Sequence, residues 1–169
     1  MAKLFFVTGA SGTGKSSIVS LLQKQLGVKY AVYDFDEIWK PYDFTDTWAE
    51  KVTKRALDIA TENEEKGISM VVAGLVRPLL VKKLAEGIRL PEIHFCLLDI
   101  NIEERKKRLE DRKASKELIS DIEELLGLRD WVKKSGYKYV TVDTTNLSPK
   151  EVVEKVTSWI RKINSQPQN

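Results

Sequence analysis

The sequence contains one cysteine and one histidine, and it has no long apolar run. A single cysteine, Cys96, cannot form a disulfide within the chain, and the lack of a cysteine quartet excludes a zinc site of that kind. His94 lies in an apolar run, where we interpret it as structural rather than catalytic. Because no run approaches the ~18–20 apolar residues of a membrane span, we expect no membrane partner.

The sequence also lacks a strong charge of either sign. Its 28 basic and 25 acidic residues leave a formal net charge of +3, which is too small to indicate a nucleic-acid partner. The chain runs from Met1 almost directly into apolar residues, without the pattern of a cleavable signal peptide. We therefore expect a cytoplasmic protein with a single domain, residues 1–169, that is a monomer or a weak homodimer.

Five short apolar runs divide the chain, at residues 4–8, 30–34, 68–73, 93–99 and 139–143. They are continuously apolar rather than alternating, as expected for parallel strands covered on both faces. Helix-spaced patterns lie between them, and the last begins with a capping box from Ser148 to Glu151 and with Pro149 at its first position. The alternation predicts right-handed crossovers, a parallel sheet and a three-layer α/β/α architecture.

Short polar residues or glycines end most of these predicted strands. In parallel sheets of this kind, ligands bind outside the carboxyl ends of the strands. We therefore expect the residues at these ends to face one cleft: Thr8, Gly9, Asp34, Gly74, Asp99 and Asp143.

A phosphate-binding pattern, G-x-x-x-x-G-K-[ST], is met at residues 9–16 by Gly9, Gly14, Lys15 and Ser16. Glycines let several backbone N–H groups approach phosphate oxygens without a Cβ clash, and the next helix N-terminus adds partial positive charge. We expect Lys15 to reach the β- and γ-phosphates of ATP and the Ser16 hydroxyl to bind Mg²⁺. A glycine-rich connection without a ligand is the alternative. The residues predicted to bind the nucleotide are Gly9, Ser11, Gly12, Thr13, Gly14, Lys15, Ser16 and Ser17.

With this loop, the chain resembles the P-loop small-molecule and nucleotide kinases, which include adenylate, shikimate and gluconate kinases, over nearly its whole length. The resemblance implies a P-loop NTPase fold whose five-stranded parallel sheet has the order 2-3-1-4-5. It also implies ATP and Mg²⁺ as cofactors and a mobile lid over the phosphates.

An acidic pair, Asp34 and Asp36, follows the second predicted strand. It looks like the pair of shikimate- and gluconate-type kinases, where the first acid helps to hold Mg²⁺ through water and the second binds the acceptor hydroxyl. This resemblance implies that Asp34 is on the metal side and that Asp36 is the acceptor-side acid or base. The alternative is that either residue merely caps the following helix.

The third predicted strand leads into a segment, residues 73–77, that is similar to the Asp-Gly-aromatic-Pro-Arg segment of adenylate kinases. Gly74 and Arg77 match it, and the match implies that Arg77 clamps the acceptor or the moving phosphoryl group. Ala73 stands where that family has its metal-side aspartate, which moves the metal role toward Asp34. The alternative for Arg77 is an exposed arginine near the start of a helix.

After the fourth predicted strand, Asn101 can cap a helix on which Arg105, Arg108 and Arg112 share one face. Like charges at this spacing repel each other in the absence of an anion. The stretch resembles the start of the lid in nucleotide kinases, which implies that Arg108 stacks on adenine and that Arg112 contacts phosphates. We expect a short lid at about residues 105–127, and a solvated, salt-bridged helix is the alternative.

Six aromatic residues gather within sixteen positions: Tyr33, Phe35, Trp39, Tyr42, Phe44 and Trp48. In the kinases that the chain resembles, this segment, at about residues 35–66 here, forms the acceptor pocket. Aromatic faces can stack on a planar ring such as a nucleoside base, or they can pack the helix after Asp36 onto the sheet.

These features predict an ATP-dependent kinase that transfers the γ-phosphate to a small acceptor. Nucleosides or nucleotides are the first candidates for the acceptor, and a shikimate- or gluconate-like hydroxyl compound is the second. A nucleotide-dependent switch or slow ATPase that signals to a protein partner stays open, as does a polynucleotide 5′-hydroxyl kinase, which the weak net charge disfavours. The predicted catalytic residues are Lys15, Asp36, Arg77 and Arg112, and the predicted metal ligands are Ser16 and Asp34.

Overall fold

The structure, a computed structural model, describes residues 1–43 and 45–165. Phe44, one of the six clustered aromatic residues, lies outside the described part. The elements follow one another as β1 (Lys3–Gly9), α1 (Lys15–Leu26), β2 (Tyr30–Asp34), the 3₁₀ turn η1 (Phe35–Glu37), α2 (Asp46–Glu65), β3 (Ser69–Gly74), α3 (Pro78–Ala85), β4 (Glu92–Asp99), α4 (Ile102–Asp111), α5 (Lys116–Ser120), α6 (Glu123–Lys134), β5 (Tyr139–Asp143) and α7 (Pro149–Asn164).

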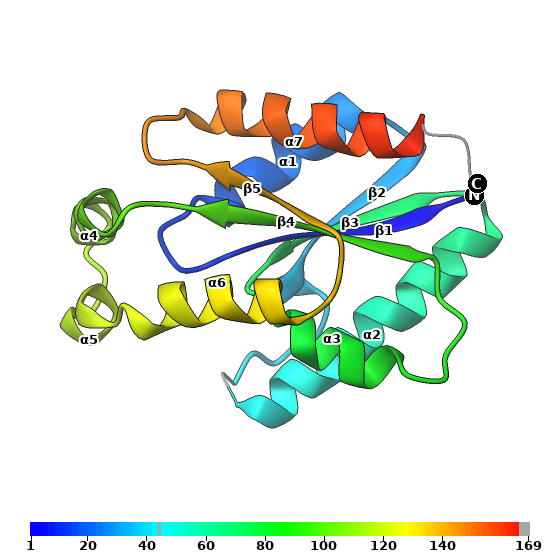
Figure 1. Ribbon diagram of the computed structural model, residues 1–169, viewed down its shortest axis with the longest axis horizontal. Helices are drawn as coiled ribbons and strands as arrows, with labels where there is room; N and C mark the ends of the chain where they lie inside the picture. Colours follow the sequence, from blue (N-terminus) through cyan, green and yellow to red (C-terminus); the bar gives the residue numbers. More distant parts are fainter. Residues whose placement is uncertain (44, 166–169) are drawn as a thin grey trace.

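The five strands form one parallel sheet in the order β2-β3-β1-β4-β5 (Figure 1). Each predicted strand agrees with the observed one to within one residue at either end. The predicted three-layer α/β/α fold and the strand order 2-3-1-4-5 are therefore confirmed.

Helices cover both faces of the sheet: α1 and α7 lie on one face, and α2, α3 and α6 lie on the other (Figure 1). The central strand β1 sends Phe5 and Val7 into the core beneath α1 and α7, and Leu4 and Phe6 into the core beneath α2. All four side chains are fully buried. Successive residues of a strand face opposite sides, so a strand covered on both faces must be apolar at every position.

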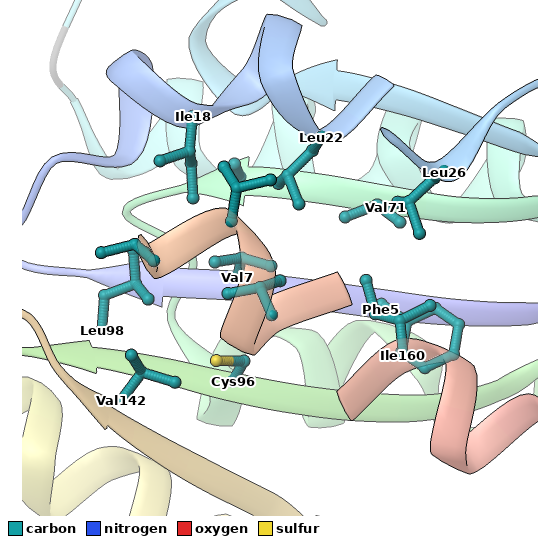
Figure 2. Packing of buried hydrophobic residues seen from close by; sticks show 14 residues of the cluster. Phe5, Val7, Ile18, Leu22, Leu26, Val71, Cys96, Leu98, Val142 and Ile160 are labelled. Atoms are coloured by element: carbon teal, nitrogen blue, oxygen red, sulfur yellow. The ribbon is translucent and has the colours of Figure 1, made fainter. Parts of the chain in front are cut away.

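The core beneath α1 and α7 fixes the helix that begins at the phosphate loop. Figure 2 shows Ile18, Leu22 and Leu26 of α1 pointing toward the sheet, opposite Ile160 of α7. These positions recur at the helix period and are at most 9% exposed. Packing along this stripe holds the N-terminus of α1 in place at the carboxyl edge of the sheet.

The predicted capping box of α7 is present. The Ser148 hydroxyl accepts a hydrogen bond from the backbone N–H of Glu151 at 3.3 Å, and the Glu151 carboxylate accepts one from Ser148 N at 2.8 Å. Pro149 occupies the first helical position, where no N–H partner is needed.

Two of the strand-end residues expected in the cleft are bound elsewhere. Both carboxylate oxygens of Asp99 accept hydrogen bonds from Arg129 Nε, at 2.9 and 3.0 Å. Asp143 Oδ1 accepts from the backbone N–H and the hydroxyl of Thr145, at 2.9 and 2.6 Å. The expectation that they face the cleft is wrong, because local partners satisfy these carboxylates. Thr8, by contrast, bonds both backbone groups of Val76 and ties β1 to the end of β3.

Candidate active site

Among the described residues, the phosphate loop lines two pockets, and a third pocket is continuous with one of them. Each is named here by its position. The loop pocket, of about 380 Å³, lies over Ser11, Gly12 and Lys15. The aromatic pocket, of about 200 Å³, lies among η1, α2 and the start of α3. The α7 pocket, of about 260 Å³, lies on the other side of the loop against the start of α7. Four residues line both the loop pocket and the aromatic pocket, which are therefore continuous: Asp36, Tyr42, Leu75 and Glu124.

The backbone of the loop explains its glycines. Gly12 and Gly14 have φ values of +92° and +93°, in the left-handed region that favours glycine. At Gly9 an added β-carbon would overlap the Thr13 hydroxyl and lie 2.9 Å from the carbonyl oxygen of Leu98. A side chain at any of these positions would distort the loop.

Arg105 supports the loop from within the protein. Its side chain is 1% exposed, and its Nε donates to the carbonyl oxygen of Ser11 at 3.0 Å. A second guanidinium nitrogen donates to Leu118 O at 3.4 Å, which ties the loop to α5. Arg105 therefore connects the loop to α5 through these two hydrogen bonds.

Lys15 lines the loop pocket. Its ammonium donates to the carbonyl oxygen of Ala10 at 2.8 Å. Burial lowers the pKa of Lys15 to about 8, although the carboxylates of Glu124 and Asp36 act in the opposite direction. Lys15 is half-buried, and a phosphate that enters the pocket would add favourable charge interaction with its ammonium.

The carboxylate of Glu124 binds a backbone donor of the phosphate loop. Its Oε1 accepts a hydrogen bond of 2.6 Å from the backbone N–H of Ser11. The sequence analysis did not single out this residue, and no motif marks it. Its one signal is that it falls within the predicted lid, residues 105–127. In the described structure, a carboxylate from the first turn of α6 thus binds one of the loop's N–H donors.

The two residues of the acidic pair, Asp34 and Asp36, have different surroundings. Asp34 Oδ1 accepts a hydrogen bond from the Asp36 N–H at 3.0 Å and caps η1, as the alternative interpretation had it for one residue of the pair. Asp36 lies where the loop pocket and the aromatic pocket meet. Partial burial and the nearby charge of Asp34 raise the pKa of Asp36, and Lys15 opposes the shift. A raised pKa makes the ionised carboxylate a stronger proton acceptor, as a general base requires.

The remaining predicted arginines lie at different pockets. Arg77 lines the aromatic pocket and pairs with Asp46 at 2.7 Å. Arg112 lines the loop pocket. Arg108 lines the α7 pocket, where its guanidinium is held by Glu104 at 3.0 Å and by the carbonyl oxygen of Thr144 at 2.7 Å. The positions of Arg108 and Arg112 on opposite sides of the loop are compatible with contacts to a base and to phosphates.

The described aromatic residues both pack and line a pocket. Phe35 and Trp48 are buried in the core beneath α2, with an edge-to-face contact at 5.8 Å. Tyr42 contacts Trp48 at 4.3 Å between ring centroids, and the Trp48 indole N–H donates to Trp39 O. Burial and the charges of Asp36 and Glu124 raise the pKa of Tyr42 to about 12.

Comparison with known proteins identifies the family. A model described as the AAA domain matches residues 6–129, which include the loop, the acidic pair and the arginines. The chain belongs to this AAA domain family.

Relatives of this AAA domain chain are named as kinases. A Methanocaldococcus jannaschii protein named "Putative adenylate kinase" is 29% identical over 163 residues, which cover 92% of this chain and 84% of the relative. A sugar kinase from Janibacter sp. HTCC2649 superposes with a TM-score of 0.65 at 17% identity, over 95% of both chains. The Mycobacterium tuberculosis APS kinase, solved with AMPPNP and APS, gives a TM-score of 0.60 at 17% identity, over 95% of this chain and 98% of its own. The structural matches show the fold, and the predicted resemblance to P-loop kinases is confirmed.

The oxygen donors present fit the magnesium ion that P-loop kinases use. Among the described residues, no three His, Cys, Asp or Glu side chains are grouped so as to hold a metal. The Ser16 hydroxyl lines the loop pocket, and Asp34 is close enough to Lys15 to influence its pKa. Mg²⁺ prefers oxygen ligands and is usually held by few protein groups together with substrate phosphates. Such a donor set matches a Mg²⁺ that arrives with ATP.

In residues 1–43 and 45–165, no helix has both the length and the apolar character that a membrane crossing requires.

The affinity for ATP is expected to fall as the pH rises through about 8. Below this pH Lys15 is charged and attracts the phosphates, whereas above it the free protein must first bind a proton. Binding at pH 9 should therefore be weaker than at pH 7 and should take up close to one proton. Isothermal titration in buffers of different ionisation enthalpy measures this uptake. Equal affinity and no uptake at pH 9 would contradict the combination of a lowered Lys15 pKa and a contact of Lys15 with the phosphates.

Gly74→Ala is expected to lower the free energy of unfolding by about 1–3 kcal/mol, as overpacking does. A β-carbon at Gly74 would overlap that of Phe35, so η1 and its Asp36 must shift. Urea unfolding and kcat should both reveal the change. Gly127→Ala is the matched control, because its β-carbon would lie 3.5 Å from Trp131, an ordinary contact. Equal stability of the two variants would contradict the tight packing of η1.

Proposed function

We propose that this P-loop phosphotransferase transfers the γ-phosphate of ATP to a small acceptor bound in the aromatic pocket. The position of Asp36 carries the proposal, because this carboxylate lines both that pocket and the loop pocket. An acceptor in one pocket and a γ-phosphate in the other would meet beside it. Nucleosides and nucleotides are the first candidates for the acceptor, and shikimate- or gluconate-like compounds are the second.

The proposed arrangement divides ATP among the pockets. Adenine occupies the α7 pocket beside Arg108, and the phosphates lie on the loop between Lys15 and Arg112. Ser16 and Asp34 would hold Mg²⁺, which would neutralise phosphate charge. Asp36 accepts the proton of the acceptor hydroxyl. At the same time the hydroxyl oxygen bonds to the γ-phosphorus, and the bond between that phosphorus and the departing ADP breaks. Lys15 and Arg112 stabilise the charge that develops during transfer.

A panel of acceptors tests this function. Nucleosides, nucleotides, sugars and sugar acids are each added with ATP and Mg²⁺, and ADP formation is followed by a coupled assay. We expect ADP to form at a rate that depends on one class of compound. ADP that forms equally fast without any acceptor would contradict the proposal and would favour the slow ATPase or switch.

The predicted lid, at about residues 105–127, should exchange its amide hydrogens more slowly when a non-hydrolysable ATP analogue binds. The phosphates displace Glu124 from Ser11 and draw Arg112 inward. Arg112→Ala should weaken the protection and lower kcat by about 10²-fold. Lys106→Ala is the control, because Lys106 is exposed and pairs with Glu110 at 3.8 Å. Hydrogen exchange that is identical with and without the analogue would contradict the lid.

A further inference from the structure

The aromatic pocket carries more negative than positive charge. Asp36 lines it from η1 and Glu124 from the first turn of α6. Within the part of the chain that the structure describes, Arg77 is the one basic residue among the lining groups. Its guanidinium is bound to Asp46 at 2.7 Å and lies 5.9 Å from the Trp131 ring centroid. Within the aromatic pocket two carboxylates therefore face an acceptor, against one arginine that already has an acidic partner. The ammonium of Lys15, which also acts on both carboxylates, lines the loop pocket instead.

This balance disfavours an anionic acceptor. A phosphate monoester brings a charge of about −1.5 to −2 and is usually recognised by several arginines. The pair of Arg77 and Asp46 is partly exposed, so it holds Arg77 only weakly and the arginine can turn to a ligand. One arginine still cannot offset both Asp36 and Glu124. In the proposed arrangement, the phosphates of bound ATP engage the basic residues of the loop pocket, Lys15 and Arg112.

A buried hydroxyl in the same pocket has no partner. Thr53 is 1% exposed and lines the pocket from α2, and its Oγ1 makes no hydrogen bond within the described structure. Thr61, two turns later on α2, bonds the carbonyl oxygen of Leu57 at 3.2 Å in the usual helical manner. A buried unsatisfied hydroxyl is unfavourable unless a ligand satisfies it. The Oγ1 atom is itself covered by protein atoms, so Thr53 bonds a polar group of the acceptor only after a small shift of the pocket wall.

The size and the walls of the pocket point to a single ring. Its volume of about 200 Å³ is below the ~300–1,000 Å³ typical of drug-sized ligands. Phe35, Trp48 and Leu80 supply apolar walls, whereas the carboxylates and Thr53 supply hydrogen-bonding groups. A ring with an apolar face and a rim of hydroxyls matches this arrangement.

We propose that the acceptor is an uncharged sugar ring that carries hydroxyls and no phosphate or carboxylate. One hydroxyl is phosphorylated beside Asp36, a second donates to Glu124, and a third bonds Thr53. For this contact Glu124 leaves Ser11 N, which then binds phosphate. The inference rests on the proposed function, and it excludes nucleotides and sugar acids from the acceptors. The sugar is either free or part of a nucleoside, and the small volume favours the free sugar.

Matched pairs of acceptors test this inference at saturating ATP. Each neutral compound is compared with an anionic counterpart: nucleosides with their 5′-monophosphates, glucose with glucose 6-phosphate, and glucose with gluconate. We expect kcat/KM of at least one neutral compound to exceed that of its anionic counterpart by about 10²-fold or more. Activity on free sugars and not on nucleosides identifies the source of the ring. A nucleotide or sugar acid as the better member of its pair overturns the inference and leaves the kinase function in place. If no compound stimulates ADP formation, the proposed function itself fails, and the inference with it.

Two variants test the proposed contacts of Thr53 and Glu124 with the acceptor. Thr53→Val keeps the shape and should raise the acceptor KM by about 10-fold without changing the KM for ATP. Glu124→Gln should lower the ratio of kcat/KM for the neutral acceptor to kcat/KM for its anionic counterpart by about 10-fold. Thr61→Val is the control, since its hydroxyl bonds the helix backbone, and it should change neither KM. An unchanged acceptor KM in Thr53→Val, or one that shifts together with the KM for ATP, contradicts a direct contact.

Discussion

Lys15→Ala is expected to lower kcat by about 10³-fold while the protein remains folded. The ammonium lines the loop pocket, in which the proposed function places the phosphates, and preorganised charges of this kind stabilise the transition state strongly. In the free protein its hydrogen bond is to the Ala10 carbonyl oxygen. The variant should therefore lose nearly all of its kcat while it stays folded.

The stability of this variant follows from the pKa of Lys15. Folding lowers that pKa from 10.5 to about 8, so the folded state disfavours the charged ammonium. The resulting destabilisation is fully present below pH 8 and disappears as the pH rises from about 8 to 10.5. At pH 7 the variant without nucleotide should melt at the same temperature as the parent or higher. Lys24→Ala, at an exposed position near the end of α1, is the control for activity and melting. Retention of most of the turnover by Lys15→Ala would refute the phosphate-loop assignment.

Asp36→Asn is expected to lower kcat by about 10²–10⁴-fold, the usual contribution of a general base, with little change in ATP affinity. The carboxylate lines both pockets, and in the proposed arrangement it contacts the acceptor rather than ATP. Glu37→Gln is the matched control, because the neighbouring Glu37 is exposed and pairs with Lys40 at 2.6 Å. It should leave kcat unchanged.

The pH profile separates a base from a structural residue. Partial burial and Asp34 raise the pKa of Asp36, and only its ionised form accepts a proton. The parent enzyme should therefore lose activity as the pH falls through this raised pKa, and the asparagine variant should lack that step. Normal turnover combined with a lower melting temperature would instead make Asp36 a structural residue. The observed cap of η1 is Asp34, which argues against that outcome.

The sheet was predictable because its signal is local. Each strand is covered on both faces, and continuous apolar runs therefore reported the strands to within one residue. The phosphate loop was equally clear, because its glycines and Lys15 are adjacent in the sequence. The position of Asp36 was predictable for a related reason, since it follows the end of β2 by two residues at the carboxyl edge of the sheet, and its role in catalysis stays a prediction.

Residues that depend on long-range packing were not predictable. Glu124 meets Ser11 across 113 positions of sequence, and nothing near Glu124 marks it as a partner of the loop. Helix spacing grouped Arg105 with Arg108, yet tertiary packing buries Arg105 under the loop. The expectation that Asp99 faces the cleft was wrong because its carboxylate is bound by Arg129, 30 residues later. That contact follows only from the placement of α6, which the sequence near Asp99 does not indicate.

The most direct test of the central claim follows the label from ATP that is labelled in its γ-phosphate. The protein is incubated with labelled ATP, Mg²⁺ and the best compound of the acceptor panel, and the products are separated. The account predicts that the label moves to the acceptor in the same amount as ADP forms and that Asp36→Asn abolishes this transfer. Label found in inorganic phosphate, at a rate that neither the acceptor nor Asp36→Asn changes, would contradict a kinase whose acceptor meets ATP at Asp36.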